Sequence, residues 1–189
     1  MEVLTGVFTA FGLSASAGLN AYIPLLVVAL LSKYTDLIEL ASPWNALESW
    51  WIIGLLIVLV TIEFFADKVP AVNHINDVIQ TFVRPVAGAV VFAASAHVIT
   101  EIHPVIALAA GVLIAGGVHA VKAVAIRPAV TATTAGAGNV PVSILEDFIS
   151  TVLSILAIVI PILIGTLLLI FAVWVARKIW HRQEKNSPA

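Results

Sequence analysis

No cysteine occurs among the 189 residues of this chain. The absence excludes a disulfide framework, a thiolate nucleophile and a cysteine-ligated zinc site. Charged residues are also scarce: they make up 11% of the chain, whereas soluble domains carry about 25%. The formal net charge of -2 shows no basic excess, which argues against nucleic acid as a partner. The composition therefore points away from a soluble domain and from a nucleic-acid-binding protein.

Short catalytic motifs are missing as well. The chain contains no G-x-S-x-G nucleophile elbow, no H-E-x-x-H zinc motif and no phosphate-binding loop with its lysine. We therefore assign no catalytic residue and expect neither a cofactor nor a resident metal. A carboxylate–histidine metal site formed by Glu63, Asp67 and His119 is the weaker alternative.

Apolar residues dominate the sequence, at 61%. A chain of this size cannot bury them all, so lipid must act as the solvent. A helix that crosses the hydrocarbon layer needs about 20 apolar residues. We predict such spans near 5–32, 50–68, 85–100 and 104–125, followed by an apolar stretch from about 144 to 179. The predicted fold class is all-α, a polytopic helical membrane protein.

The last apolar stretch is too long for one crossing and contains Pro161, which interrupts a helical hydrogen-bond ladder. It is either one kinked helix or two helices with a turn near Pro161. With two helices, the predicted loops 68–84 and 126–143 share a side with the C-terminal segment 176–189, which includes the predicted cytoplasmic tail 180–189. Eight of the nine basic residues then lie on that side. The positive-inside rule then places both termini in the cytoplasm. We predict one integral domain, 1–189, with about six spans in the inner (plasma) membrane.

The first predicted span is interrupted. Residues 12–24, "GLSASAGLNAYIP", bring small residues, Asn20 and Pro24 into the middle of a membrane segment. Small residues let two helices approach closely, which is one interpretation. The other is a broken helix whose freed backbone groups line a cavity. No basic residue precedes Lys33, so we treat this segment as part of the mature fold and not as a cleaved signal peptide.

A weak internal similarity relates two parts of the chain. "NDVIQTFV" (76–83) resembles "EDFISTVL" (146–153), and upstream of each a charged span end runs into a proline. Two helix–loop–helix units, 50–100 and 104–158, would explain the similarity and would put both polar loops on one membrane face. Chance similarity between apolar sequences is the alternative. In the second loop, Ser143 is predicted to cap the helix that follows it.

Nine of the twenty charged residues lie in two strips near the predicted span ends. The strips hold five acids and four bases, and such a near balance is what burial requires, because an unpaired ion in a bilayer is costly. Asn20 and His119 lie close to these strips in the predicted arrangement. The predicted substrate- or ion-binding residues are Asn20, Glu63, Asp67, Lys68, Asp77, Arg84, His119, Lys122, Arg127, Glu146 and Asp147.

The spacing of these residues predicts which of them pair. Glu63 and Asp67 are four residues apart on one helix face, where like charges repel unless a cation lies between them or one carboxyl is protonated. His119 and Lys122 form a matching basic face. We therefore predict contacts of Glu63 and Asp67 with His119 and Lys122. The alternative for the outer charges is that they reach the lipid headgroups and only mark helix ends.

The segments "GLSASAGLNAYIPLL", "EFFADKVP", "HAVKAVAIRP" and "SILED" together resemble a family of small multi-pass bacterial membrane proteins that is catalogued only as a domain of unknown function. The resemblance covers nearly the whole chain. It implies an integral membrane protein with these polar positions as its hallmark, and it implies no substrate or mechanism. The sequence departs from the family pattern at Asn73, where we expect an acid.

From the residues themselves we expect a small transporter or channel-like protein. A charge-balanced polar cavity between the first, second and fourth spans would open toward the cytoplasm, with Glu63 and Asp67 binding a cation or a coupling proton. The expected partners are membrane lipid, a small solute or ion of unknown identity, and a second copy of the chain in a homodimer. The alternatives are a membrane-embedded enzyme or lipid-headgroup-binding protein, and a structural or assembly subunit.

Overall fold

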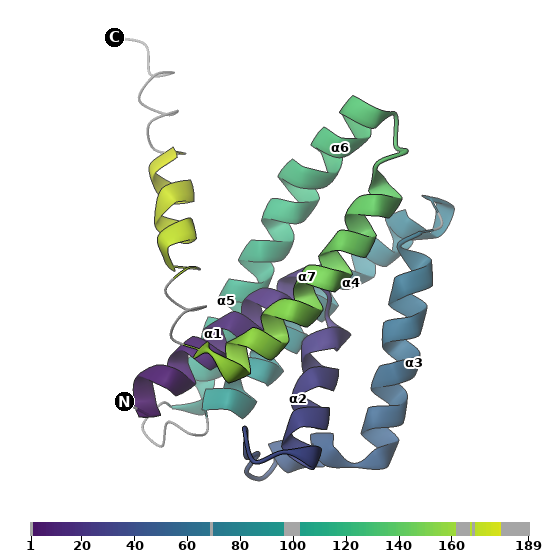
Figure 1. Ribbon diagram of the computed structural model, residues 1–189. Helices are drawn as coiled ribbons and strands as arrows, with labels where there is room; N and C mark the ends of the chain where they lie inside the picture. The colour runs from purple at the N-terminus through teal and green to yellow at the C-terminus, as the bar shows by residue number, and fades with distance from the viewer. Residues whose placement is uncertain (1, 69, 97–102, 162–166, 168, 179–189) are drawn as a thin grey trace.

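The computed structural model describes residues 2–68, 70–96, 103–161, 167 and 169–178. Every regular element in these ranges is helical. Most of the helices pack side by side and run between the same two ends of the molecule (Figure 1). The predicted all-α fold class is confirmed.

Helix α1 (Glu2–Leu19) and helix α2 (Tyr22–Tyr34) are separated at Asn20 and Ala21. Pro24 lies in the first turn of α2, where its missing backbone N–H leaves no helical hydrogen bond unmade. The break predicted within the first apolar segment is therefore confirmed.

The break also reverses the chain. The contacts between α1 and helix α7 (Asn139–Val159) give the relative direction of the two helices. Ser16 hydrogen-bonds Ser154, whereas Asn20, just after the end of α1, hydrogen-bonds the earlier residue Asp147. Helix α1 is thus antiparallel to α7, and α2 returns toward the end at which α1 begins (Figure 1). The prediction of one crossing over 5–32 is wrong: the segment is a helical hairpin with its tip at Asn20.

Helix α3 (Trp50–Ala66) is followed almost directly by helix α4 (Pro70–Ala96). The predicted loop at 68–84 is wrong, because most of it is the first half of α4. Polar side chains that we assigned to a loop recur at helical spacing and form one face of α4. They are Asn76, Gln80 and Arg84.

Helix α5 (Pro104–Val121) continues through a wide π-helical turn (Lys122–Ile126) into helix α6 (Arg127–Thr134). Pro128 explains the wide turn, because its ring would clash with the carbonyl four residues earlier in a regular α-helix. The predicted loop at 126–143 is therefore largely helical.

A short turn joins α6 to α7. Ala135 has a φ of 50° and Gly136 a φ of 89°, so both residues adopt left-handed backbone conformations that end α6. Helix α7 begins at Asn139, so Ser143 lies within the helix and does not cap it. The predicted cap is wrong.

Helix α7 ends inside the last apolar stretch, close to Pro161. The helix ends at Val159, and Ile160 leaves the helical conformation with φ -133° and ψ 61° just before Pro161. A separate helical segment covers 169–178. An unbroken helix over 144–179 is excluded. The choice between one kinked helix and two helices depends on residues 162–166, which lie outside the described residues.

The α3–α4 junction and the α6–α7 turn lie at one end of the bundle, which we call the charged end (Figure 1). The start of α1 lies at the opposite end, since α1 is antiparallel to α7. The prediction that the N-terminus lies beside these polar connections is wrong, because the tip at Asn20 reverses the chain. The tail 180–189 lies outside the described residues. Two successive hairpins with turns at one end fit the predicted repeat, although duplication itself stays a prediction.

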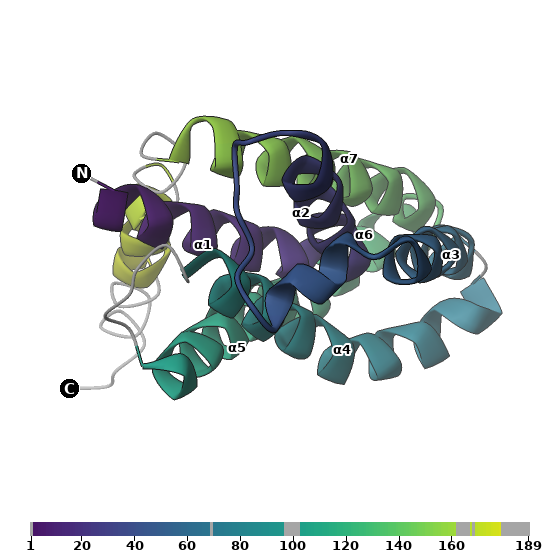
Figure 2. The same cartoon turned by 90° about the horizontal axis from the view of Figure 1, so that it is seen from below.

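Helix α1 lies in the middle of the bundle, between α7 on one side and α4 and α5 on the other (Figure 2). Small side chains on α1 and its neighbours let the helices approach closely enough for α1 to occupy this central position. The Ser14 hydroxyl donates to the Gly88 carbonyl at 2.8 Å. The space beside Gly18 is already filled by Ala115 and Val118. Close packing by small residues therefore accompanies the break in this segment.

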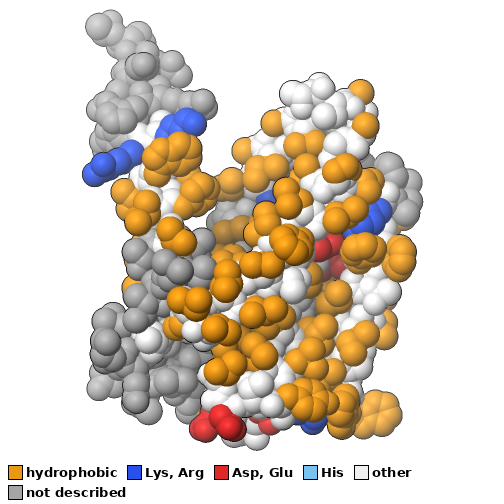
Figure 3. All heavy atoms as spheres, in the orientation of Figure 1, with side chains coloured by type: hydrophobic (Ala, Val, Ile, Leu, Met, Phe, Trp, Pro, Cys, Tyr) orange, Lys and Arg blue, Asp and Glu red, His pale blue; other side chains and the backbone are white. Residues whose placement is uncertain are grey.

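Three helical stretches of the described chain are long and apolar enough to cross a membrane: 75–95, 104–134 and 139–159. Helices α1, α2 and α3 are shorter apolar helices. Large apolar side chains cover the outer face (Figure 3), and Tyr34, Trp50 and Trp51 are exposed, in the manner of an aromatic belt at a membrane surface.

Candidate functional site

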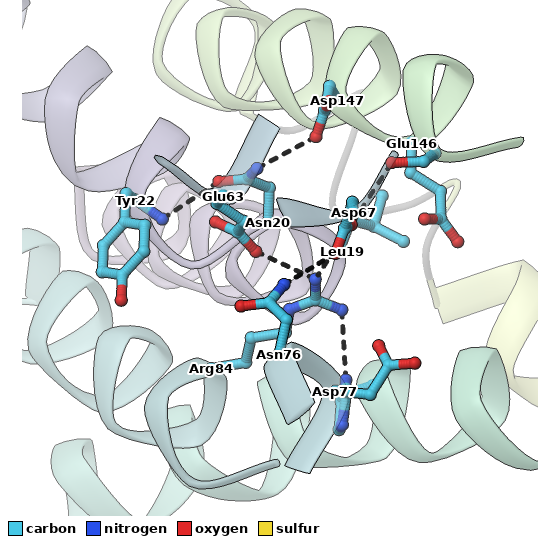
Figure 4. Close-up of polar contacts among 12 residues, drawn as sticks. Leu19, Asn20, Tyr22, Glu63, Asp67, Asn76, Asp77, Arg84, Glu146 and Asp147 are labelled. Carbon is cyan, nitrogen blue, oxygen red and sulfur yellow. Dashed lines mark hydrogen bonds and ion pairs between the residues drawn. The ribbon is translucent and has the colours of Figure 1, made fainter. Parts of the chain in front are cut away.

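The predicted site residues gather near the charged end, around the tip of the α1–α2 hairpin (Figure 4). Helices α3, α4, α5, α6 and α7 and the π-helical turn contribute the remaining side chains. Two contact networks form, and they are joined through the backbone at Leu19–Asn20 and at Glu146–Asp147. We call the whole set the charged cluster: Asn20, Glu63, Asp67, Lys68, Asp77, Arg84, His119, Lys122, Arg127, Glu146 and Asp147. Their proposed role in binding stays a prediction.

Glu63 and Arg84 form a buried ion pair at the centre of the cluster. The Nη2 atom of Arg84 lies 2.9 Å from Oε1 of Glu63, and the two side chains are 0% and 1% exposed. The same Nη2 atom lies 4.0 Å from Oδ2 of Asp67. Arg84 is therefore the cation between the two stacked carboxylates. The prediction that His119 and Lys122 pair with these acids is wrong, because Arg84 of α4 occupies that position.

His119 acts as a hydrogen-bonding link in this arrangement. Its Nδ1 atom lies 3.2 Å from Nη1 of Arg84, and its Nε2 atom lies 3.2 Å from the hydroxyl of Thr81. A guanidinium can only donate, so Nδ1 must accept and the proton of the ring must be on Nε2. His119 is thus neutral, and it does not supply the positive charge that we predicted for it.

Asp67, the residue that follows α3, is held by several donors. Arg127 contacts it at 3.1 Å, Asn76 at 2.7 Å and Ser143 at 3.2 Å. Burial raises the pKa of the Asp67 carboxyl, but the positive charges of Arg127, Lys122 and Arg84 and the hydrogen bond from Asn76 outweigh it and lower the pKa. Asp67 is therefore ionised at neutral pH.

Lys122 lies in the π-helical turn and pairs with α7. Its ammonium lies 2.7 Å from Oε2 of Glu146 and donates to the backbone carbonyl of Leu19 at 3.2 Å. Arg127 bridges Glu146, at 3.5 Å, and Asp77, at 3.1 Å. Lys122 thus satisfies a carbonyl that the end of α1 leaves free.

Asn20 binds the backbone N–H groups that the break leaves free at the start of α2. Its side-chain carbonyl accepts from the backbone N–H groups of Tyr22 and Ile23, each at 3.1 Å, and so caps α2. Its amide donates to Asp147 at 3.0 Å. Asp147 also pairs with Lys68 at 3.5 Å, and both of these side chains are 15% exposed. The freed backbone groups of the broken helix are therefore bound by cluster side chains.

An Asn20→Ala variant is expected to lose about 1 to 2 kcal/mol of unfolding free energy, because the cap of α2 and the bond to Asp147 are both lost. Asn139→Ala is the matched control: Asn139 is bonded to Thr131 on the exposed surface, and its replacement is expected to cost less than about 0.5 kcal/mol. Reversible unfolding in detergent micelles measures both values. Equal losses would contradict the role assigned to Asn20.

Sequence reasoning missed several polar residues of this region. Asn76, Gln80 and Thr81 were assigned to a loop, although the four-residue spacing of Asn76, Gln80 and Arg84 is a helical signal that could have revealed them. Ser143 was assigned to a cap, yet it binds Asp67. The expectation about Asn73 concerns a side chain outside the described part of the structure.

The fold and the cluster together define a class: a polytopic helical membrane protein with a buried network of ion pairs at a broken helical hairpin. The chain belongs to the family described as Domain of unknown function (DUF4126), whose profile matches residues 7–181. The resemblance to an uncharacterised family is thereby confirmed. Neither a curated protein nor a solved structure shows significant similarity to the chain.

Proposed function

We propose that this chain is a small membrane transporter whose site for an ion or small solute is the charged cluster. One observation carries the proposal: ionised side chains of four helices surround the point at which a membrane hairpin is broken. Lys122 and Asn20 bind the backbone groups that the break releases. Ionisable residues at membrane depth are costly, and their usual reason is function. Discontinuous helices with ion-binding ends are the usual architecture of transporter sites.

The chain has a proposed orientation in the membrane, with the charged end on the cytoplasmic side. Lys68, Arg84, Lys122 and Arg127 belong to the charged end, and Lys33 lies at the opposite end. The positive-inside rule favours a cytoplasmic charged end in the plasma (inner) membrane. The outer apolar faces contact lipid in this proposal, and a homodimer of so short a chain encloses the full pathway.

The protein reconstituted into liposomes is expected to carry protons, Na⁺ or K⁺ across the membrane. A pH-sensitive dye inside the vesicles reports protons, and the corresponding metal-ion dyes report the other two. Glu63→Gln removes a buried carboxylate of the cluster and is expected to reduce the flux to the level of empty liposomes, since the site loses its ionisable acid.

Glu39→Gln is the matched control, because it makes the same chemical change at an exposed position outside the cluster. It is expected to retain the flux of the parent protein. A parent protein with no flux of any of the three ions above empty liposomes would contradict the proposal, as would a changed lipid profile without flux, which indicates an enzyme.

A further inference from the structure

Among the described residues, the charged cluster has one more acid than base. It holds five carboxylates and four cationic side chains, and the hydrogen bonds of His119 make that ring neutral. A buried network with one uncompensated carboxylate is costly in a membrane. One further unit of positive charge would remove the imbalance.

The partners of each acid show where the imbalance is greatest. Asp77 and Asp147 are 29% and 15% exposed, so water screens them. Glu146 has the ammonium of Lys122 at 2.7 Å, and Asp67 has three close donors. Glu63 is 1% exposed, and its one ion-pair partner among the described residues is Arg84, which contacts a single oxygen. Glu63 is therefore the acid with the weakest compensation.

Two buried acceptors on side chains near Tyr22 have no donor among the described residues. Oε2 of Glu63 and Oε1 of Gln80 are both buried and lack a hydrogen-bond partner among the described residues. Gln80 hydrogen-bonds the hydroxyl of Tyr22, which also lies within electrostatic range of Glu63. Both side chains thus border the same part of the cluster. With the Gln80 amide oriented so that its nitrogen donates to Tyr22, a proton on Oε2 of Glu63 would supply the donor that both acceptors lack.

We propose that Glu63 is a proton-binding site, with the proton on Oε2 and donated to Oε1 of Gln80. A hydronium ion at the charged end gives up the proton and becomes water as an O–H bond forms on Oε2. On release this bond breaks and a water molecule takes up the proton. Binding makes the cluster neutral and turns the Glu63–Arg84 ion pair into a hydrogen bond between a neutral acid and a guanidinium. The inference rests on the proposed function and names its ion as the proton.

A proton fits this position better than a metal cation. The proton needs one acceptor, whereas a metal ion needs several ligands. Among the described residues, no group of three or more His, Cys, Asp or Glu side chains could hold a metal ion. The titratable or charged groups of the cluster and its neighbours around Glu63 are Tyr22, Asp67, Lys68, Asp77, Arg84, His119, Lys122, Arg127, Glu146 and Asp147.

Infrared difference spectroscopy of the full chain in lipid nanodiscs tests the proposal. A band from a protonated, buried carboxylic acid is expected to grow as the pH is lowered. Glu63→Gln is expected to remove this band. Gln80→Leu leaves Glu63 and Arg84 in place and is expected to weaken proton binding about tenfold, since one buried hydrogen bond is lost.

Glu39→Gln serves as the control and is expected to retain the band. The absence of a protonated-acid band in the parent protein would overturn the proposal, and so would a band that survives Glu63→Gln in a variant that still unfolds cooperatively. Because this measurement needs no transport, a Glu63 band without flux contradicts the proposed function alone. Proton flux without a Glu63 band contradicts this inference alone.

Discussion

At a pH above the one at which Glu63 binds its proton, Arg84→Met is expected to lower the free energy of unfolding by about 3 to 5 kcal/mol, because it leaves Glu63 as a buried charge without a partner. Arg84 is 0% exposed and contacts Glu63 at 2.9 Å, Asp67 at 4.0 Å and His119 at 3.2 Å. Methionine keeps much of the side-chain volume, so the loss of stability results from removing the charge and not from creating a cavity. Denaturant unfolding in detergent micelles measures it.

Two further variants isolate the cause. Lys68→Met removes a cluster cation that is 15% exposed, and we expect a loss of less than about 1 kcal/mol. The double variant Glu63→Gln and Arg84→Met is expected to recover part of the stability that Arg84→Met loses, because the unpaired carboxylate is gone. A double variant as unstable as the sum of both single variants would show that the two charges are not coupled.

Gly111→Ala is expected to cost about 1 to 3 kcal/mol or more, because α4 and α5 must move apart. A Cβ at Gly111 would meet the carbonyl oxygen of Gly88 and would lie 2.6 Å from Cα of Ala89. Both of these atoms belong to the backbone of α4, so no side-chain rotation can relieve the clash. Unfolding in detergent micelles again measures the change.

Gly117→Ala on the same helix is the matched control. A Cβ at Gly117 would meet nothing within 4 Å, and alanine favours a helix over glycine by up to about 1 kcal/mol. We expect this variant to be neutral or slightly stabilised. If both alanine variants lost the same stability, the close α4–α5 contact would not explain the effect at Gly111.

The residues of the charged cluster could be predicted from the sequence, but their partners could not. Glu63 and Arg127 stand out because a charge in so apolar a chain must be compensated somewhere. Which residues pair depends on which helices are neighbours and on how far along each helix axis the residues lie. Arg84 was assigned to a loop, and only the extension of α4 back to Pro70 brings it between Glu63 and His119.

Composition and spacing alone determined the membrane class, the break near Asn20 and the charged strips, because hydrophobicity, backbone propensity and the cost of a buried ion belong to the residues themselves. Only the tertiary structure showed that the chain reverses its direction at the break. Asn20 caps α2 while Lys122 holds the carbonyl of Leu19, and together they stabilise a reversal of the chain. The contact of Lys122 with Leu19 joins residues 103 positions apart, so no local pattern could specify it.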